Sequence, residues 1–312
     1  MTMLSRVAER LFWMARYLER AEDTARLTSA YAHLIMDIPV GDDPGWQTLV
    51  NIMDADEVFE ANHRVHNEHN VLRFLIANGD NPASIRFAVK AARENVRTTR
   101  DQLPEEAWEQ VNELYLYSEE MAEKSVGRRN RYAFLEEIIT RCQMINGMIL
   151  TTISRDHAYR FIKLGHLLER SDMTSRVIDV GTGSILTREA PDTAIDPLLW
   201  GYLLQALSAM GAYRRTIGPQ LEAATVVDFL FTEERFPRSL QFCLRGIHEE
   251  LKPLHNSAET LALLDSTRRK VSRFQAQSLS LEQIHLFIDE FQLALNQVSN
   301  TITATWFQPE SS

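Results

Sequence analysis

Apolar residues recur at helical spacing along nearly the whole chain of 312 residues, and no stretch shows the sustained alternation of a strand. In the first segment, Leu4, Val7, Leu11, Met14 and Leu18 lie on one face of a helix. The chain is therefore expected to have an all-α fold with a bundle-like body.

The same pattern sets the expected element bounds. A first helix should end at a loop at 38–45, and a second loop is expected at 181–197, where GTGS (181–184) would end a helix. Further helices are predicted at about 46–61, 63–77, 83–101, 105–125, 130–153, 155–180, 198–217, 219–231, 238–252, 256–276 and 280–306.

The chain repeats itself at an offset of about 150 residues. When Arg10–Arg26 is aligned with Arg160–Arg176, six of the seventeen positions are identical. A second segment, VLRFLIANGDNPASIRFAV from Val71, matches VVDFLFTEERFPRSLQFCL from Val226 at a slightly larger offset. We interpret the two matches, which occur in the same order, as an internal duplication.

The duplication predicts two pseudo-equivalent multi-helix repeats, at 1–153 and 154–307, packed together as one body and followed by a flexible tail at 308–312. A proline occupies the same place in both copies, Pro82 and Pro237. Proline at the first helical position loses no hydrogen bond and has a suitable φ, so each proline is expected to start a helix.

Charge and cysteine content narrow the function classes. With 33 Lys and Arg against 43 Asp and Glu, the net charge is −10, so nucleic acid is not an expected partner. No apolar run reaches the ~18 residues of a membrane span, and the first twenty residues are too charged for a secretory signal. A cytoplasmic protein is expected, with Cys142 and Cys243 as buried free thiols.

Each copy carries a Glu-Arg pair beside its apolar face. These pairs are Glu19-Arg20 and Glu169-Arg170. A small residue, Ala15 or Gly165, lies one turn before each glutamate and would let another helix approach closely. In a structural interpretation, each glutamate pairs with an arginine across the seam between two helices and fixes their register. In a functional interpretation, the carboxylates line a pocket as acid/base groups or ligand anchors.

The remaining polar and aromatic motifs are weaker indications of a functional site. Ion pairs four residues apart, Glu22–Arg26 and Asp172–Arg176, are expected on helix surfaces. Trp13 and Tyr17 lie four apart on a less apolar face, where they would be core or would dock a partner.

The spacing of the histidines does not predict a metal site. His63 and His66 follow Glu60 at a spacing that would place them on a polar helix face, and His285 ends a second E-x-x-H. Because the two motifs do not fall at equivalent positions of the repeat, no di-metal bundle is predicted. The glycine-rich motifs of nucleotide-binding proteins are also missing, so no cofactor is predicted.

The Glu-Arg segments carry a family resemblance. MLSRVAERLFWMARYLERAEDTARL (3–27) and ISRDHAYRFIKLGHLLERSDMTSRVID (153–179) resemble the two signatures of the alpha-E domain family, a helical bacterial family of unknown function named for its Glu-Arg motif. NPAS (81–84) and FPRS (236–239) also fit its pattern, and the resemblance covers essentially the whole chain.

Several expectations follow from the resemblance alone. It implies an all-α fold and, through gene association in the family, work beside a circularly permuted ATP-grasp ligase and a transglutaminase-like peptidase that make or process a peptide-like amide product. It marks Ser154, Arg155 and Asp156 as motif members beside the Glu-Arg pairs, whereas Lys163 and His166 differ from the residues expected at their places.

Three functions are compatible with these observations. The leading one is an accessory or scaffold subunit of the ligase and peptidase system. The first alternative is an enzyme in which Glu19 and Glu169 share a pocket while Arg20 and Arg170 hold a substrate carboxylate. The second is a stand-alone binding module for acidic or peptide-like ligands. No residue is assigned a catalytic role, and the oligomeric state has no sequence signal.

Overall fold

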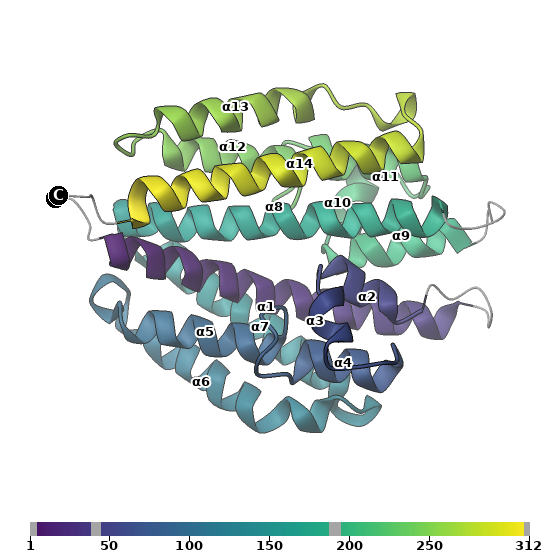
Figure 1. Cartoon of the computed structure of the whole chain (residues 1–312), viewed down its shortest axis with the longest axis horizontal. Coiled ribbons are helices and arrows are strands. Elements are labelled where there is room, and N and C mark those ends of the chain that lie inside the picture. The colour runs from purple at the N-terminus through teal and green to yellow at the C-terminus, as the bar shows by residue number, and fades with distance from the viewer. Residues whose placement is uncertain (1–4, 39–44, 187–194, 309–312) are drawn as a thin grey trace.

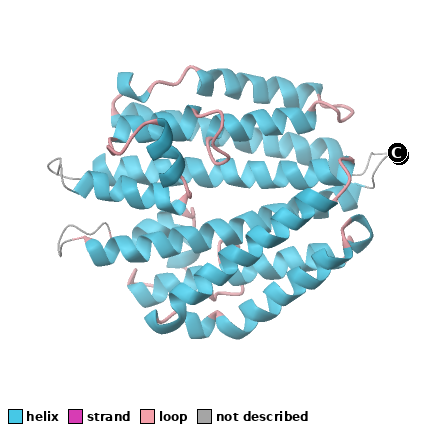
Figure 2. Ribbon diagram, turned by 180° about the vertical axis from the view of Figure 1, so that it is seen from behind, coloured by secondary structure: helices cyan, strands magenta, loops and turns pink. Residues whose placement is uncertain are grey.

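The computed structural model describes residues 5–38, 45–186 and 195–308, which form helices and no strand (Figure 1, Figure 2). The helices are α1 (Ser5–Asp37), α2 (Gln47–Ile52), α3 (Asp56–Glu60), α4 (Glu68–Ile76), α5 (Ile85–Arg97), α6 (Glu105–Met121), α7 (Arg128–Thr152), α8 (His157–Leu186), α9 (Ile195–Ala206), α10 (Met210–Thr216), α11 (Ala223–Thr232), α12 (Leu240–Leu251), α13 (Ala258–Ser272) and α14 (Leu281–Ile302). Short turns of other helix types are η1 (Arg100–Gln102), η2 (Glu123–Ser125), η3 (Ala276–Ser278) and η4 (Thr303–Phe307), the last of them π-helical.

The two longest helices, α1 and α8, run side by side in the same direction through the middle of the molecule (Figure 1). They make the most extensive contact between any two elements. Helices α5, α6 and α7 cover one side of this central pair, and α12, α13 and α14 cover the other. The all-α prediction is confirmed.

The apolar core is shared by the two halves of the chain. One buried cluster joins α1 to α5, α6 and α7 and includes Ala158 and Ile162 of α8. The other joins α2, α3 and α4 to most of the second half of the chain, with Phe12, Trp200 and Phe307 among its members. Helix α2 packs on α8 and α9 packs on α1, so each central helix is covered partly by the other half of the chain.

Two predicted helices are each broken in the structure. The segment 46–61 forms α2 and α3, and 198–217 forms α9 and α10. At the breaks, Asp54 and Ser208 have positive φ values of 50° and 53°. The amides of Ala55 and Ala209 bond back to the carbonyls of the third-last helical residues, at 3.2 and 2.7 Å, which is the Schellman way of ending a helix.

The prediction that Pro82 and Pro237 occupy the first helical position is wrong. Both lie in turns, and the serine two residues later is the N-cap. The Ser84 and Ser239 hydroxyls each accept a 3.1 Å hydrogen bond from the amide three residues on. Each hydroxyl also donates to a carbonyl six residues earlier, which closes the preceding turn around the proline.

Other bounds also differ from expectation. Helix α8 continues to Leu186, so residues 181–184 belong to it and do not end it. Helix α4 begins only at Glu68, so His63 and His66 precede it and share no helix face. The rest of the second loop, at 187–194, most of the first, at 39–44, and the tail from 309 lie outside the described residues.

None of the described helices combines the length and the hydropathy that a bilayer crossing needs.

Candidate functional site

The seam between α1 and α8 is very narrow at one point. A Cβ added to Gly165 would collide with the backbone carbonyl of Phe12 and would lie 3.3 Å from the Cβ of Ala15. The expectation that small residues one turn before each glutamate allow close approach is thereby confirmed. This contact brings the Glu-Arg pairs of the two helices to the same level.

Across the seam, the Glu-Arg pairs exchange partners. Arg20 donates to both carboxylate oxygens of Glu169, from Nε to Oε1 at 2.5 Å and from Nη2 to Oε2 at 3.0 Å. Arg170 holds Glu19 in the same bidentate way, at 2.6 and 3.1 Å. The geometry is the one that the structural interpretation describes, with each glutamate paired across the seam.

The Glu169 carboxylate has a further cation. Arg16 donates from Nε to Oε2 at 2.7 Å, and its guanidinium lies 5.0 Å from the centre of the Trp13 ring. Burial alone would raise the pKa of Glu169, but Arg20 and Arg16 outweigh it and lower the pKa to about 2. Glu169 is therefore a buried and fully ionised carboxylate at neutral pH.

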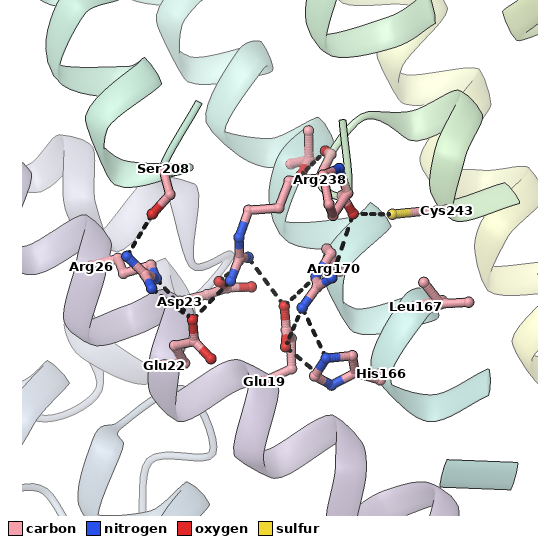
Figure 3. A network of polar contacts seen from close by, with 12 residues as sticks. Glu19, Glu22, Asp23, Arg26, His166, Leu167, Arg170, Ser208, Arg238 and Cys243 are labelled. Carbon is pink, nitrogen blue, oxygen red and sulfur yellow. Dashed lines mark hydrogen bonds and ion pairs between the residues drawn. The ribbon is translucent and has the colours of Figure 1, made fainter. Parts of the chain in front are cut away.

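The Glu19 carboxylate has more polar and charged neighbours than the Glu169 carboxylate (Figure 3). Besides Arg170, it contacts Nη1 of Arg238 at 3.1 Å and Nδ1 of His166 at 3.1 Å. Burial opposes ionisation, but the neighbouring charges hold the pKa of Glu19 well below its usual range. Burial also lowers the pKa of His166 to about 3, so the imidazole is neutral. Its contacts fit Nδ1–H donating to Glu19 and Nε2 accepting from Arg170 at 2.8 Å.

Arg238 ties two more acids of α1 to this cluster. It donates to Asp23 at 2.5 Å and to Glu22 at 3.0 Å, and Glu22 also accepts from Arg26 at 2.9 Å (Figure 3). Burial, opposed by Arg238, raises the pKa of Asp23 to about 8. The expected Glu22–Arg26 pair exists, but its placement on the helix surface is wrong, because Glu22 is buried against Arg238.

The turns that precede α5 and α12 face the arginines of the seam. Arg20 donates to the carbonyl of Pro82 at 3.5 Å, and Arg170 donates to that of Pro237 at 3.4 Å. Thr24 donates to the carbonyl of Ala83 at 3.3 Å, while Thr174 donates to that of Arg238 at 3.0 Å. The NPAS and FPRS segments are thus fastened to α1 and α8 respectively.

Two cavities of unequal size border the seam. The larger, of about 910 Å³, is lined by Arg170, His166 and Arg238 on the Glu19 side. The smaller, of about 250 Å³, is lined by Arg20 and Glu169. Neither of these two cavities is lined by both glutamates, so a single pocket shared by Glu19 and Glu169 has no support from them.

The other motif residues lie away from this centre. Asp156 caps α8 by accepting from the amides of Ala158 and Tyr159, at 2.9 and 3.4 Å. Arg155 donates to the carbonyl of Leu150 at 2.8 Å and stacks on Tyr159. Ser154 is exposed beside them. Glu169 lies thirteen positions after Asp156, roughly 20 Å along the axis of α8.

The aromatic and sulfur groups behave as part of the scaffold. Trp13 and Tyr17 pack on each other and on the guanidinium groups of Arg16 and Arg20. Cys142 and Cys243 are buried free thiols, as predicted. Burial raises the pKa of Cys243 to about 11, so this thiol is protonated and unreactive at neutral pH.

The histidines of the two E-x-x-H motifs have different neighbours in the structure and do not form one site. His63 and His66 both stack on Phe59. His285 instead pairs with Asp179 of α8 at 2.5 Å and lies 3.9 Å from Asp289. Asp179, His285 and Asp289 form the one metal-compatible cluster of three such side chains among the described residues; Asp179 and His285 are half-buried and Asp289 is exposed.

Sequence reasoning missed Arg238, Asp23 and Arg16 as members of the site. Arg16 has histidine at the position 150 residues later, and Arg238 aligns with Ala83, so the repeat carried no signal for either residue. The one available signal for Asp23 was its place beside Glu22, one turn after Glu19.

The fold and the site together define an all-helical protein whose two central helices are joined by crossed Glu-Arg ion pairs. The chain belongs to the alpha-E family, described as a predicted alpha-helical domain with a conserved ER motif, whose profile matches residues 3–307. Both Glu-Arg pairs of the seam fall within that range.

Curated relatives are similar over nearly the whole chain. An uncharacterized protein of Mycobacterium bovis, Mb2597, and two of Mycobacterium tuberculosis, MT2643 and Rv2567, are each 23% identical over 331 aligned positions, which cover 96% of this chain. The chain spans only 36% of the length of each of these relatives. No solved structure matches the chain with significance.

Proposed function

We propose that the protein is a non-catalytic accessory or scaffold subunit of an amide-forming system, and that its Glu-Arg pairs hold the central helices together. The observation that carries this proposal is the saturation of both glutamates. Glu169 accepts three hydrogen bonds from two arginines, and Glu19 contacts Arg170, Arg238 and His166. Since a carboxylate has about four lone-pair positions, little capacity remains for a substrate.

The ionisation of the glutamates argues in the same direction. A general acid or base works best when its pKa lies near the operating pH. The pKa of Glu169 is lowered to about 2 and that of Glu19 is also far below its usual range, so neither exchanges a proton near neutral pH. The enzyme alternative, with these two residues as acid/base groups, is therefore the weaker hypothesis.

The expected partners are an ATP-grasp ligase and a transglutaminase-like peptidase, in the cytoplasm where ATP is supplied. The family resemblance is the source of this part of the proposal. It is supported by the length of the mycobacterial relatives, in which a region similar to this chain is joined to further sequence. A helical subunit that works beside another domain is compatible with such a fusion.

We also infer that the two halves of the chain arose by duplication. Contacts that recur at corresponding positions support this inference: the crossed Glu-Arg pairs, the arginine bonds to the carbonyls of Pro82 and Pro237, and the N-caps Ser84 and Ser239. The paired helix ends at Asp54 and Ser208 add to it.

The scaffold role of the pairs is tested with Glu19→Gln and Glu169→Gln, each measured by denaturant unfolding. Removing one partner of a buried ion pair leaves the other charge uncompensated, so each variant should lose roughly 3–5 kcal/mol of unfolding free energy. Glu259→Gln, at an exposed position on α13, is the matched control. Unchanged stability in both seam variants would contradict the scaffold role.

The partners are tested by native mass spectrometry of tagged protein captured gently from its own cells. We expect a stoichiometric complex with a ligase or peptidase of the two classes named. Protein that is recovered without either partner and that turns over a substrate unaided would overturn the accessory role.

A further inference from the structure

The larger cavity beside Glu19 holds cations that the seam does not use. Lys163 is half-buried on its wall, and Arg215 and Arg235 are exposed at its edge. None of the three side chains makes an ion pair within 4 Å with any described residue, whereas Arg26, Arg170 and Arg238 on the same lining all do. The lining therefore contains three cations without an ion-pair partner among the described residues, although the net charge of the protein is −10.

The acids of the lining do not cancel this charge. Glu22 is already engaged by Arg26 and Arg238. Glu233 accepts a 2.9 Å hydrogen bond from the backbone amide of Arg235 and forms no ion pair with a cation of the described residues, which leaves an excess of two positive charges among the unpaired groups of the lining. Beneath the cavity, burial raises the pKa of Asp23 to about 8, so this carboxyl adds little negative charge at neutral pH.

The two sides of the seam carry different residues at corresponding positions of α1 and α8. On the Glu169 side, α1 presents Trp13 and Tyr17, which pack on each other and on the neighbouring arginines. The residues 150 positions later on α8 are Lys163, which lines the larger cavity, and Leu167, which is fully buried. The cavity on the Glu19 side has a volume of about 910 Å³ and the one on the Glu169 side about 250 Å³.

The remaining lining indicates what kind of anion would fit. Gln143 and Asn146 of α7 supply side-chain amides, which can both donate to and accept from peptide groups. Leu150, Leu207 and Phe236 supply apolar surface. A volume of about 910 Å³ is in the range of pockets that enclose organic ligands and is far larger than a single inorganic anion requires.

We propose that this cavity binds an acidic peptide-like ligand through at least two of its carboxylates, with Lys163 contacting one at the wall and Arg215 and Arg235 contacting another at the edge. Separated cations suit carboxylates that are spaced along a chain, and the amides and apolar groups between them suit the chain itself. This proposal is independent of the accessory role, because a ligand can occupy the cavity whether or not a ligase partner exists.

The test is calorimetric titration of the full chain with a hexaglutamate peptide, with hexaglutamine and tripolyphosphate as comparison ligands. We expect saturable binding of hexaglutamate that weakens as salt is raised, and no binding of hexaglutamine. An absence of saturable hexaglutamate binding would overturn the proposal. Tripolyphosphate binding as tight as or tighter than that of hexaglutamate would overturn the peptide-like part of it.

The site is tested with the variant Arg215→Gln/Arg235→Gln, which changes only exposed side chains, and with Lys163→Gln in addition. Loss of a charge-assisted hydrogen bond should weaken hexaglutamate binding by about tenfold or more. The matched control is Arg269→Gln/Arg273→Gln, two exposed arginines outside the cavity. An equal loss of hexaglutamate affinity in the control would show a general charge effect. Unchanged affinity in the cavity variants would place the ligand elsewhere. Either result would contradict the proposed site.

Discussion

At the scale of single residues, the two glutamates of the seam have related but unequal surroundings. Glu169 is held by two arginines, Arg20 and Arg16. Glu19 is held by two arginines and a neutral histidine, and one of these arginines, Arg238, also holds Asp23 and Glu22. The acid-rich cluster is thus confined to the Glu19 side, beside the larger cavity.

Asp23 makes the stability of this cluster dependent on pH. Its pKa rises from an ordinary 3.8 to about 8 on folding, chiefly because the carboxyl is buried. The unfolded chain ionises Asp23 freely above about pH 4 while the folded chain keeps it protonated, so this group lowers stability as pH rises from about 4 to 8.

Asp23→Asn should therefore change the pH dependence of melting. Because asparagine cannot ionise, the melting temperature of the variant should rise relative to that of the unmodified protein between pH 5 and pH 8. Thermal melts at several pH values in this range measure the difference. Asp101→Asn, at an exposed position on η1, is the matched control. A difference in melting temperature between Asp23→Asn and the unmodified protein that stays constant across this pH range would show that folding does not raise the pKa of Asp23.

How far the sequence predicts the site is clearest at this scale. The crossed Glu-Arg pairing was one of the arrangements that residues 19–20 and 169–170 suggested, because charged residues beside an apolar face must be paired when buried. The partners supplied by Arg238 and Arg16 were not predictable. Both come from positions where the two copies differ, and tertiary contacts alone bring them to the carboxylates.

At the scale of elements, the contact between α1 and α8 depends on a missing side chain. Glycine lowers the helix propensity of α8 by roughly 1 kcal/mol relative to alanine, yet the carbonyl of Phe12 occupies the space that a Cβ at position 165 would need. The close approach sets the distance at which the glutamates and arginines meet.

Gly165→Ala should therefore destabilise the protein despite the better helix propensity of alanine. Overpacking at such a contact costs about 1–3 kcal/mol, and the backbone of Phe12 cannot move aside as a flexible side chain would. Gly147→Ala, at an exposed position toward the C-terminal end of α7 with open space around it, is the control and should be neutral or stabilising by up to about 1 kcal/mol. Denaturant unfolding measures both; equal effects would refute the close-contact argument.

The observed helix bounds show where apolar periodicity does not predict the end of a helix. Apolar spacing continues through the breaks at Asp54 and Ser208, so it predicted one helix where the structure has two. Both residues adopt positive φ without being glycine, and the sequence around them has no proline to mark the stop. At the NPAS and FPRS segments, the serine cap rather than the proline begins the helix.

At the scale of the whole molecule, the two halves of the chain depend on one another. Each central helix carries glutamates and arginines whose partners lie in the other half, and α2 and α9 each pack on the central helix of the other half. A half alone would therefore keep unpaired charges beside exposed apolar surface.

Residues 1–153 and 154–312, produced as two separate chains, should be unstable alone and should copurify as a one-to-one complex when produced together. The reason is that only the complex restores the crossed ion pairs and the shared cores. Circular dichroism of each half and of the complex, with size-exclusion chromatography, measures the outcome. A cooperative thermal transition in either isolated half would contradict this mutual dependence.

The crossed pairing also has a consequence for synthesis. Partners in the seam are separated by 149 or 151 residues, so α1 leaves the ribosome long before α8 exists. At translation rates of about 5–20 residues per second, the delay is roughly 8–30 seconds, far longer than a helix needs to form. During that interval Glu19 and Arg20 lack the partners that they have across the seam. The nascent first half therefore exposes the face of α1 that later packs on α8, and we expect a chaperone to bind the nascent chain there.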